Sequence, residues 1–264
     1  MKKSMLLFSA IFYFAFCNAQ ILTIDKTDTS AYTKRTMLKA NLAIGIEGDK
    51  QRQLLLDGTN ALDVQLRHYK ELLILAASYR FTYNGGQDFL NSGYLHLRWR
   101  HDYKNTWQPE TFVQYQWNNS RGLLHRLTSG INARYNHWNK NNQEFSVASG
   151  VMYENETWNY TAVDSALKPA IQTNQVTSLL KSNNYVRWEG KTSANSNISA
   201  VVFLQMPFNN LFGQYRLASN INFTVNFAKH FDLGFSFSSM YDSRPVVPIL
   251  KFYYNFSNSI VYKF

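Results

Sequence analysis

The chain has 264 residues, of which 45% are hydrophobic and 16% aromatic, and its mean hydropathy is −0.34. This composition is rich in aromatic side chains but too polar for a helical membrane protein, and the length suits one large all-β domain or two small domains. Lys and Arg outnumber Asp and Glu by 27 to 17, a basic balance that favours anionic partners such as lipopolysaccharide, nucleic acid or acidic solutes.

The first residues have the pattern of a secretory signal peptide. A charged start, Lys2-Lys3, precedes the apolar run Met5–Cys17, which is too short for a membrane-spanning helix. We expect residues 1–19 to be removed by cleavage near Ala19-Gln20. The mature domain, 20–264, then keeps an excess of eight positive charges, because two of the lysines leave with the signal.

Cys17 is the one cysteine of the sequence. A lipid anchor on it is the alternative to simple cleavage, but that signal requires a small residue before the cysteine, and Phe16 stands there. The mature chain contains no cysteine, which excludes disulfide bonds, thiolate metal sites and cysteine nucleophiles together.

Alternation of apolar and polar residues with a period of two dominates the rest of the chain. It runs without error through Ile221–Phe227 and Phe231–Ser238, which predicts strands with one apolar and one polar face. We expect twelve strands, near 37–47, 58–68, 71–83, 90–103, 107–117, 125–138, 143–156, 181–192, 195–207, 213–228, 231–242 and 247–264. Most reach the length of about nine to eleven residues that a tilted strand needs to cross a bilayer, whereas ordinary strands have about five or six.

The expected connections alternate between short and long. The short ones lie near 68–70, 104–106, 139–142, 191–195 and 229–230, and the long ones near 48–57, 84–89, 118–124, 156–180, 208–212 and 242–246. Outer-membrane barrels have short periplasmic turns, long outer loops and an even number of strands. This pattern predicts an all-β fold, a transmembrane antiparallel up-and-down β-barrel with both termini on the periplasmic side.

Each expected strand separates an apolar face from a charged face. The charged face carries Glu47, Asp63, Arg67, Arg80, Arg98, Arg100, Arg126, Arg134, Glu154, Arg187 and Glu189. In a soluble sandwich the apolar face would be the core, whereas in a membrane barrel it meets lipid and the charged face lines the lumen. Aromatic residues at strand ends, such as Tyr103, Trp107 and Trp117, favour the barrel, because Tyr and Trp prefer the membrane interface.

The C-terminus also suits a barrel. Tyr262 and the terminal Phe264 alternate with polar residues on the last expected strand, which resembles the signature by which outer-membrane barrels are recognised for assembly. We expect this strand to pair with the first one, so that no edge is left open.

A longer stretch has a more specific resemblance. The segment YLHLRWRHDYKNTWQPETFVQYQWNN, followed by LLHRLTSGINARYN and SVASGVMYENETW, resembles the YdiY-like outer-membrane family, a family of unknown function sometimes called salt-induced. The matching features include Arg98, Gly130 and Gly150, whereas Asn132 stands where family members often have Gly. The resemblance implies an outer-membrane β-barrel of a Gram-negative bacterium and implies no catalytic residues.

The charged face has two interpretations. Its arginines and carboxylates either pack the lumen as ion pairs, because buried charges need partners, or form an electropositive constriction that passes or holds small anions. Twelve strands lie between the roughly eight that give a filled interior and the sixteen or more that leave a channel, so we expect a narrow or plugged lumen. The loop 156–180 folds over the mouth, binds a partner or is simply solvated.

Signals for enzymatic chemistry are weak. The six histidines lack paired metal-ligand spacing, and there is no G-x-S-x-G motif. Ser129 and His137 share a face but lie eight residues apart, too far to bond, so an outer-membrane lipid hydrolase is the enzymatic alternative. We predict no catalytic residue, metal site or cofactor. The expected partners are outer-membrane lipids or lipopolysaccharide, the barrel-assembly machinery and a small anionic solute, with no nucleic acid.

Overall fold

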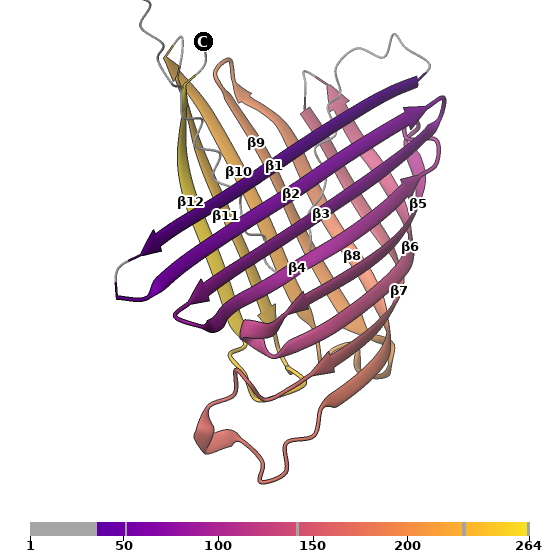
Figure 1. Ribbon diagram of the computed structural model, residues 1–264. Coiled ribbons are helices and arrows are strands. Elements are labelled where there is room, and N and C mark those ends of the chain that lie inside the picture. Colours follow the sequence, from indigo (N-terminus) through magenta and orange to yellow (C-terminus); the bar gives the residue numbers. More distant parts are fainter. Residues whose placement is uncertain (1–35, 51, 141–142, 229–230, 263–264) are drawn as a thin grey trace, which may run out of the picture.

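The computed structural model describes residues 36–50, 52–140, 143–228 and 231–262. Twelve antiparallel strands form one sheet, in which each strand pairs with its neighbours in the chain (Figure 1). The strands are β1 (Thr36–Lys50), β2 (Leu54–His68), β3 (Glu71–Asn84), β4 (Gln87–Arg100), β5 (Trp107–Asn118), β6 (Leu123–Lys140), β7 (Gln143–Trp158), β8 (Gln175–Ser193), β9 (Ser196–Pro207), β10 (Arg216–Ala228), β11 (Phe231–Asp242) and β12 (Phe252–Tyr262). The three short 3₁₀ turns are η1 (Asn119–Arg121), η2 (Ser165–Leu167) and η3 (Phe208–Asn210).

The predicted fold class, twelve antiparallel strands in up-and-down order, is confirmed. The sheet is strongly curled, so that β1–β4 cross the front and β8–β12 form the back, as in a β-barrel (Figure 1). In the described part of the chain β1 and β12 stand at the two ends of the strand order, and their pairing stays a prediction. No helix among the described residues is long and apolar enough to span a membrane.

The connections fall at two ends of the sheet. What we call the loop end carries 52–53, 85–86, 119–122, 159–174, 208–215 and 243–251, and the turn end carries 69–70, 101–106 and 194–195. The segment 159–174 projects furthest, below the strands in Figure 1. The predicted alternation of short and long connections therefore holds only in part, because two of the loop-end connections are also short.

Two predicted loops were wrong. Strands β1 and β2 pair up to Lys50 opposite Leu54, so the expected loop 48–57 is mostly strand. The expected loop 84–89 is a tight turn at Gly85-Gly86, where positive φ angles of 57° and 97° suit residues without a Cβ.

The last expected strand, 247–264, was also too long at its start. It begins at Phe252, because the residues before it, which include Pro245 and Pro248, leave the sheet. Its backbone pairs as far as Tyr262 with Phe231. Phe264, the expected signal peptide 1–19 and Cys17 lie outside the described residues.

The two faces of the sheet differ sharply. Large apolar side chains are exposed on the outer face of almost every strand, including Leu42, Leu97, Ile131, Val186 and Phe256. The opposite face is buried, and its side chains contact non-neighbouring strands: the Tyr185 hydroxyl on β8 donates to Glu110 on β5 at 2.7 Å. Such a contact requires both residues to lie on the concave side, so the buried face is the inner one.

Candidate functional site

Most of the predicted charged residues are buried on this inner face. They are Arg67, Arg98, Arg100, Arg126, Arg134, Arg187 and Glu154. Asp63 and Arg80 are half-buried, and Glu189 keeps about a quarter of its side chain exposed, at 28%. Glu47 is exposed near the end of β1, because this strand stands at the end of the strand order and has β2 as its one described neighbour. Glu47 is therefore not part of the buried set.

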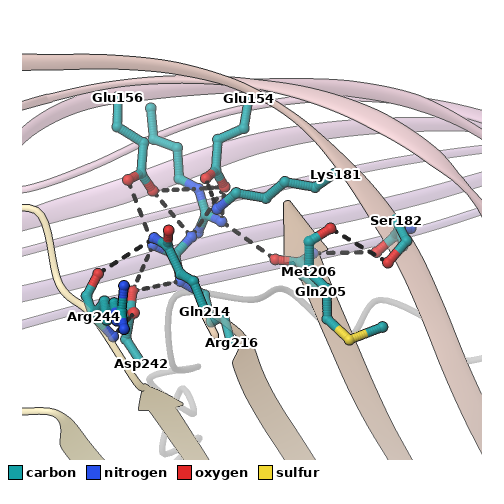
Figure 2. Close-up of polar contacts among 12 residues, drawn as sticks. Glu154, Glu156, Lys181, Ser182, Gln205, Met206, Gln214, Arg216, Asp242 and Arg244 are labelled. Carbon is teal, nitrogen blue, oxygen red and sulfur yellow. Dashed lines mark hydrogen bonds and ion pairs between the residues drawn. The ribbon is translucent and has the colours of Figure 1, made fainter. Parts of the chain in front are cut away.

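Six charged side chains near the loop end form one group, which we call the loop-end ion cluster. Its members are Arg126, Glu154, Glu156, Lys181, Arg216 and Asp242, from β6, β7, β8, β10 and β11. Figure 2 shows most of them converging inside the curled sheet. Three cations face three carboxylates, so the cluster is balanced in charge.

Arg216 is the centre of this cluster. Its Nη1 donates to Glu154 Oε2 and to Glu156 Oε1, both at 3.0 Å, and its Nη2 donates to Asp242 Oδ2 at 2.8 Å (Figure 2). Strands β7 and β10 are not neighbours in the sheet. One guanidinium therefore joins two parts of the inner face that the backbone pairing leaves separate.

The remaining cations complete the cluster. Arg126 Nε donates to Glu154 Oε2 at 2.7 Å and lies 3.0 Å from Glu156 Oε1, while Lys181 forms an ion pair with Glu154. A row of amides extends the contacts, since Gln205 Nε2 donates to Asn183 Oδ1 at 3.1 Å. Buried ions are tolerated only with such complete pairing.

A second group, the turn-end ion cluster, lies near the opposite end. It contains Arg100, Glu110, Arg134, Glu144 and Arg187, with Tyr185 bonded to Glu110. Arg100 Nε donates to Glu110 Oε1 at 2.7 Å, and Arg134 forms an ion pair with Glu144. Arg187 Nη1 lies 3.7 Å from Glu144 Oε1.

Apolar side chains fill the interior between and beside the two clusters. One group on β7–β11 contains Ala148, Tyr185, Val201, Phe203, Ala218 and Met240, with Tyr253 of β12 packed against it. Another on β3 contains Leu72, Ile74 and Ala76, against which Tyr94 and Tyr103 pack. The inner face is thus a packed core of alternating ionic and apolar regions.

The segment 243–251, which we call the strap, covers the loop end. Val247 is 1% exposed and packs with Leu123, Trp158 and Val163. Tyr160, Val246 and Ile249 pack against the same group. The strap therefore brings the β11–β12 connection into contact with β6, β7 and the segment 159–174. Of the expected loop 156–180, only Trp158, Tyr160 and Val163 take part in this contact, and the rest of 159–174 projects away from the strands (Figure 1).

A cation–π contact ties the same end together. The guanidinium carbon of Arg121, in η1 between β5 and β6, lies 3.3 Å from the ring centroid of Tyr253 on β12. Burial lowers the pKa of Arg121 to about 10, partly offset by Tyr253, so the side chain stays charged at neutral pH. Stacking on the ring compensates for some of the hydration that this cation loses.

Several members of the clusters were not singled out from the sequence. They are Glu110, Glu144, Glu156, Lys181, Arg216 and Asp242. Strand parity gives a signal for them: Glu156 lies two residues after Glu154, and Glu110 shares the parity of Gln114 and Gln116. Among the described residues no group of three or more His, Cys, Asp or Glu is arranged to hold a metal ion.

The fold and these clusters define a class of protein: a twelve-stranded, barrel-like antiparallel sheet with an apolar exterior and an ion-paired interior. The model of the family of proteins of unknown function DUF481 matches residues 59–264. The chain belongs to this family, which confirms the expected resemblance to the YdiY-like family. No curated protein and no solved structure matches the chain.

Proposed function

We propose that the protein is an outer-membrane β-barrel whose lumen is closed and which acts through its loop end. The observation that carries the proposal is the packed interior. Ion pairs between non-neighbouring strands, such as Arg216 with Glu154, cross the space that a channel would need. The strap closes the loop end, with Val247 fully buried.

The membrane placement rests on the outer face. Leu42 is 68% exposed and Phe256 60%, and similar residues recur on the other strands. Monomeric soluble proteins rarely expose contiguous apolar surface beyond a few hundred Å². Lipid is the partner that fits a period-two apolar face around a curled sheet. The expected signal peptide and C-terminal signature support export and handling by the barrel-assembly machinery.

A narrow anion-binding barrel is the second candidate, and the charge count favours it. Among the described residues, eight buried side chains are basic (Arg67, Arg98, Arg100, Arg126, Arg134, Lys181, Arg187 and Arg216) and five are acidic (Glu110, Glu144, Glu154, Glu156 and Asp242). An excess of three positive charges suits a small anion held among the arginines. Binding of an anion in this way does not require a path that conducts ions through the barrel.

Planar-bilayer recording separates the two candidates. The purified protein, folded in detergent and shown to migrate faster unboiled than boiled on a gel, is added to a lipid bilayer. A closed lumen predicts repeated recordings without discrete channel openings. Openings with an anion-selective reversal potential that Arg98→Ser/Arg100→Ser abolishes would establish the second candidate instead.

We propose no enzymatic activity for the protein. Ser129 and His137 lie eight residues apart on β6, too far for the two side chains to bond. Phospholipid hydrolysis by the purified protein, absent from a boiled sample, would contradict this part of the proposal.

A further inference from the structure

We infer that the loop end of β10–β12 is a binding site for a phospholipid of net negative charge. The inference rests on the proposed placement in the outer membrane and adds the position and the chemistry of one lipid contact. The site consists of outward-facing aromatic residues on the strands, apolar residues on the adjoining connections 208–215 and 243–251, and two exposed cations.

Aromatic side chains gather at this end of the outer face. Tyr215 and Tyr241 have ring centroids 5.7 Å apart, and those of Phe252 and Tyr254 are 5.9 Å apart. Tyr241 of β11 pairs in register with Phe252 of β12, so the two aromatic pairs adjoin, with Tyr215 directly before the start of β10. Aromatic residues at strand ends favour the level of the lipid headgroups.

The two adjoining connections are joined to each other and carry further apolar surface. Ser243 N donates to Tyr215 O at 3.0 Å, and Gln214 Nε2 donates to Arg244 O at 3.4 Å. On these connections Phe212 is 94% exposed and Leu250 is 72% exposed. This surface continues the apolar exterior of the strands beyond their last residues.

Two exposed cations border this surface. Arg244 and Lys251 are exposed, and neither forms an ion pair with a described residue. The connections 208–215 and 243–251 contain no Asp or Glu. The Asp242 carboxylate accepts the backbone N–H of Arg244, and the Asp242 N–H donates to the Lys251 carbonyl oxygen at 2.8 Å. These bonds fix the backbone of both cationic residues where the strap leaves β11 and joins β12.

This combination selects an anionic amphiphile. Acyl chains suit the aromatic and aliphatic surface, and an uncompensated phosphate suits the two positive charges on the strap. A single lipid molecule provides both the acyl chains and the phosphate. It would lie at the level where the strands leave the apolar layer of the membrane. The segment 159–174 makes a poorer site, because its Lys168 is accompanied by Asp164.

The test is native mass spectrometry of the detergent-solubilised full-length protein with equal amounts of phosphatidylglycerol and phosphatidylcholine as probes. We expect preferential retention of phosphatidylglycerol. Arg244→Gln/Lys251→Gln should weaken its binding about twenty-five-fold, at about fivefold for each cation. The matched control, Lys168→Gln/Lys191→Gln, removes the same charge elsewhere and should leave the preference unchanged.

The experiment distinguishes failure of the lipid site from failure of the proposed membrane barrel. Equal retention of both lipids by a protein that shows heat-modifiable migration would overturn the lipid site and leave the barrel standing. Equal loss of binding in the site variant and the control would show a general charge effect and would also overturn the site. A protein that needs no detergent would overturn both the site and the membrane placement.

Discussion

Replacing Arg216 with Gln tests the loop-end ion cluster. The change removes one positive charge from a group in which Arg216 contacts Glu154, Glu156 and Asp242 within 3.0 Å. Three buried carboxylates would then face two cations, Arg126 and Lys181. The cluster changes from balanced to an excess of one negative charge, in surroundings where that charge is poorly hydrated.

The magnitude follows from the burial. Removing one partner of a buried ion pair costs about 3–5 kcal/mol, because the remaining charge stays buried and uncompensated. We therefore expect Arg216→Gln to lower the free energy of unfolding by about 3–5 kcal/mol, a large fraction of the roughly 5–15 kcal/mol typical of a folded domain. Arg216→Gln/Glu156→Gln restores the balance and should recover about 1–3 kcal/mol of this loss through the coupling of the two sites.

The assay is urea unfolding in detergent or lipid, followed by the fluorescence of the six tryptophans. Arg244→Gln is the matched control, because it removes the same charge from an exposed position two residues after Asp242 and should change stability by less than about 0.5 kcal/mol. A loss below about 1 kcal/mol for Arg216→Gln would refute the reasoning, as would a double variant less stable than the single one.

Two further changes test the packing. A Cβ at Gly150 would overlap the backbone carbonyl of Ile131, so Gly150→Ala should cost about 1–3 kcal/mol in the same unfolding assay, whereas Gly45→Ala, whose Cβ would lie 3.7 Å from its nearest neighbour, should be nearly neutral. Val247→Asp places an unpaired charge in the buried strap contact and should lower the free energy of unfolding by about 3 kcal/mol, whereas planar bilayers should stay silent because the ion pairs still fill the interior. Leu250→Asp, on the exposed side of the same strap, should change the free energy of unfolding by less than about 0.5 kcal/mol; equal losses in the two variants would contradict the packing of the strap on Leu123 and Trp158.

The strands and their faces could be predicted from the sequence because the period-two pattern is local. The alternation in Phe231–Ser238, for example, sets which side of β11 is apolar before any partner is known. Burial of Arg98, Arg126 and Arg134 followed from the same parity. When one face of a long strand is apolar and directed outward, the charged residues of the other face are directed into the interior.

The contacts across the interior could not be predicted in the same way. Arg216 meets Glu154 and Glu156 because the sheet curls enough to bring β10 to β7, and curl is a property of the whole sheet. The strap was missed for a related reason. Val246 and Val247 are as apolar as strand residues. Val247 turns inward because Leu123 and Trp158, which are distant in sequence, provide an apolar surface for it to pack on.

Spin labelling along β11 tests most directly whether the apolar face meets lipid. Single cysteines are introduced at outward positions 233, 235 and 237 and at inward positions 234, 236 and 238, in a Cys17→Ser background. In lipid bilayers we predict high collision rates with oxygen at the odd positions and low rates at the even ones, with a polar nickel reagent excluded from the odd positions. Odd positions shielded from oxygen, or no alternation along the strand, would contradict the membrane barrel and favour a soluble sheet packed on its apolar face.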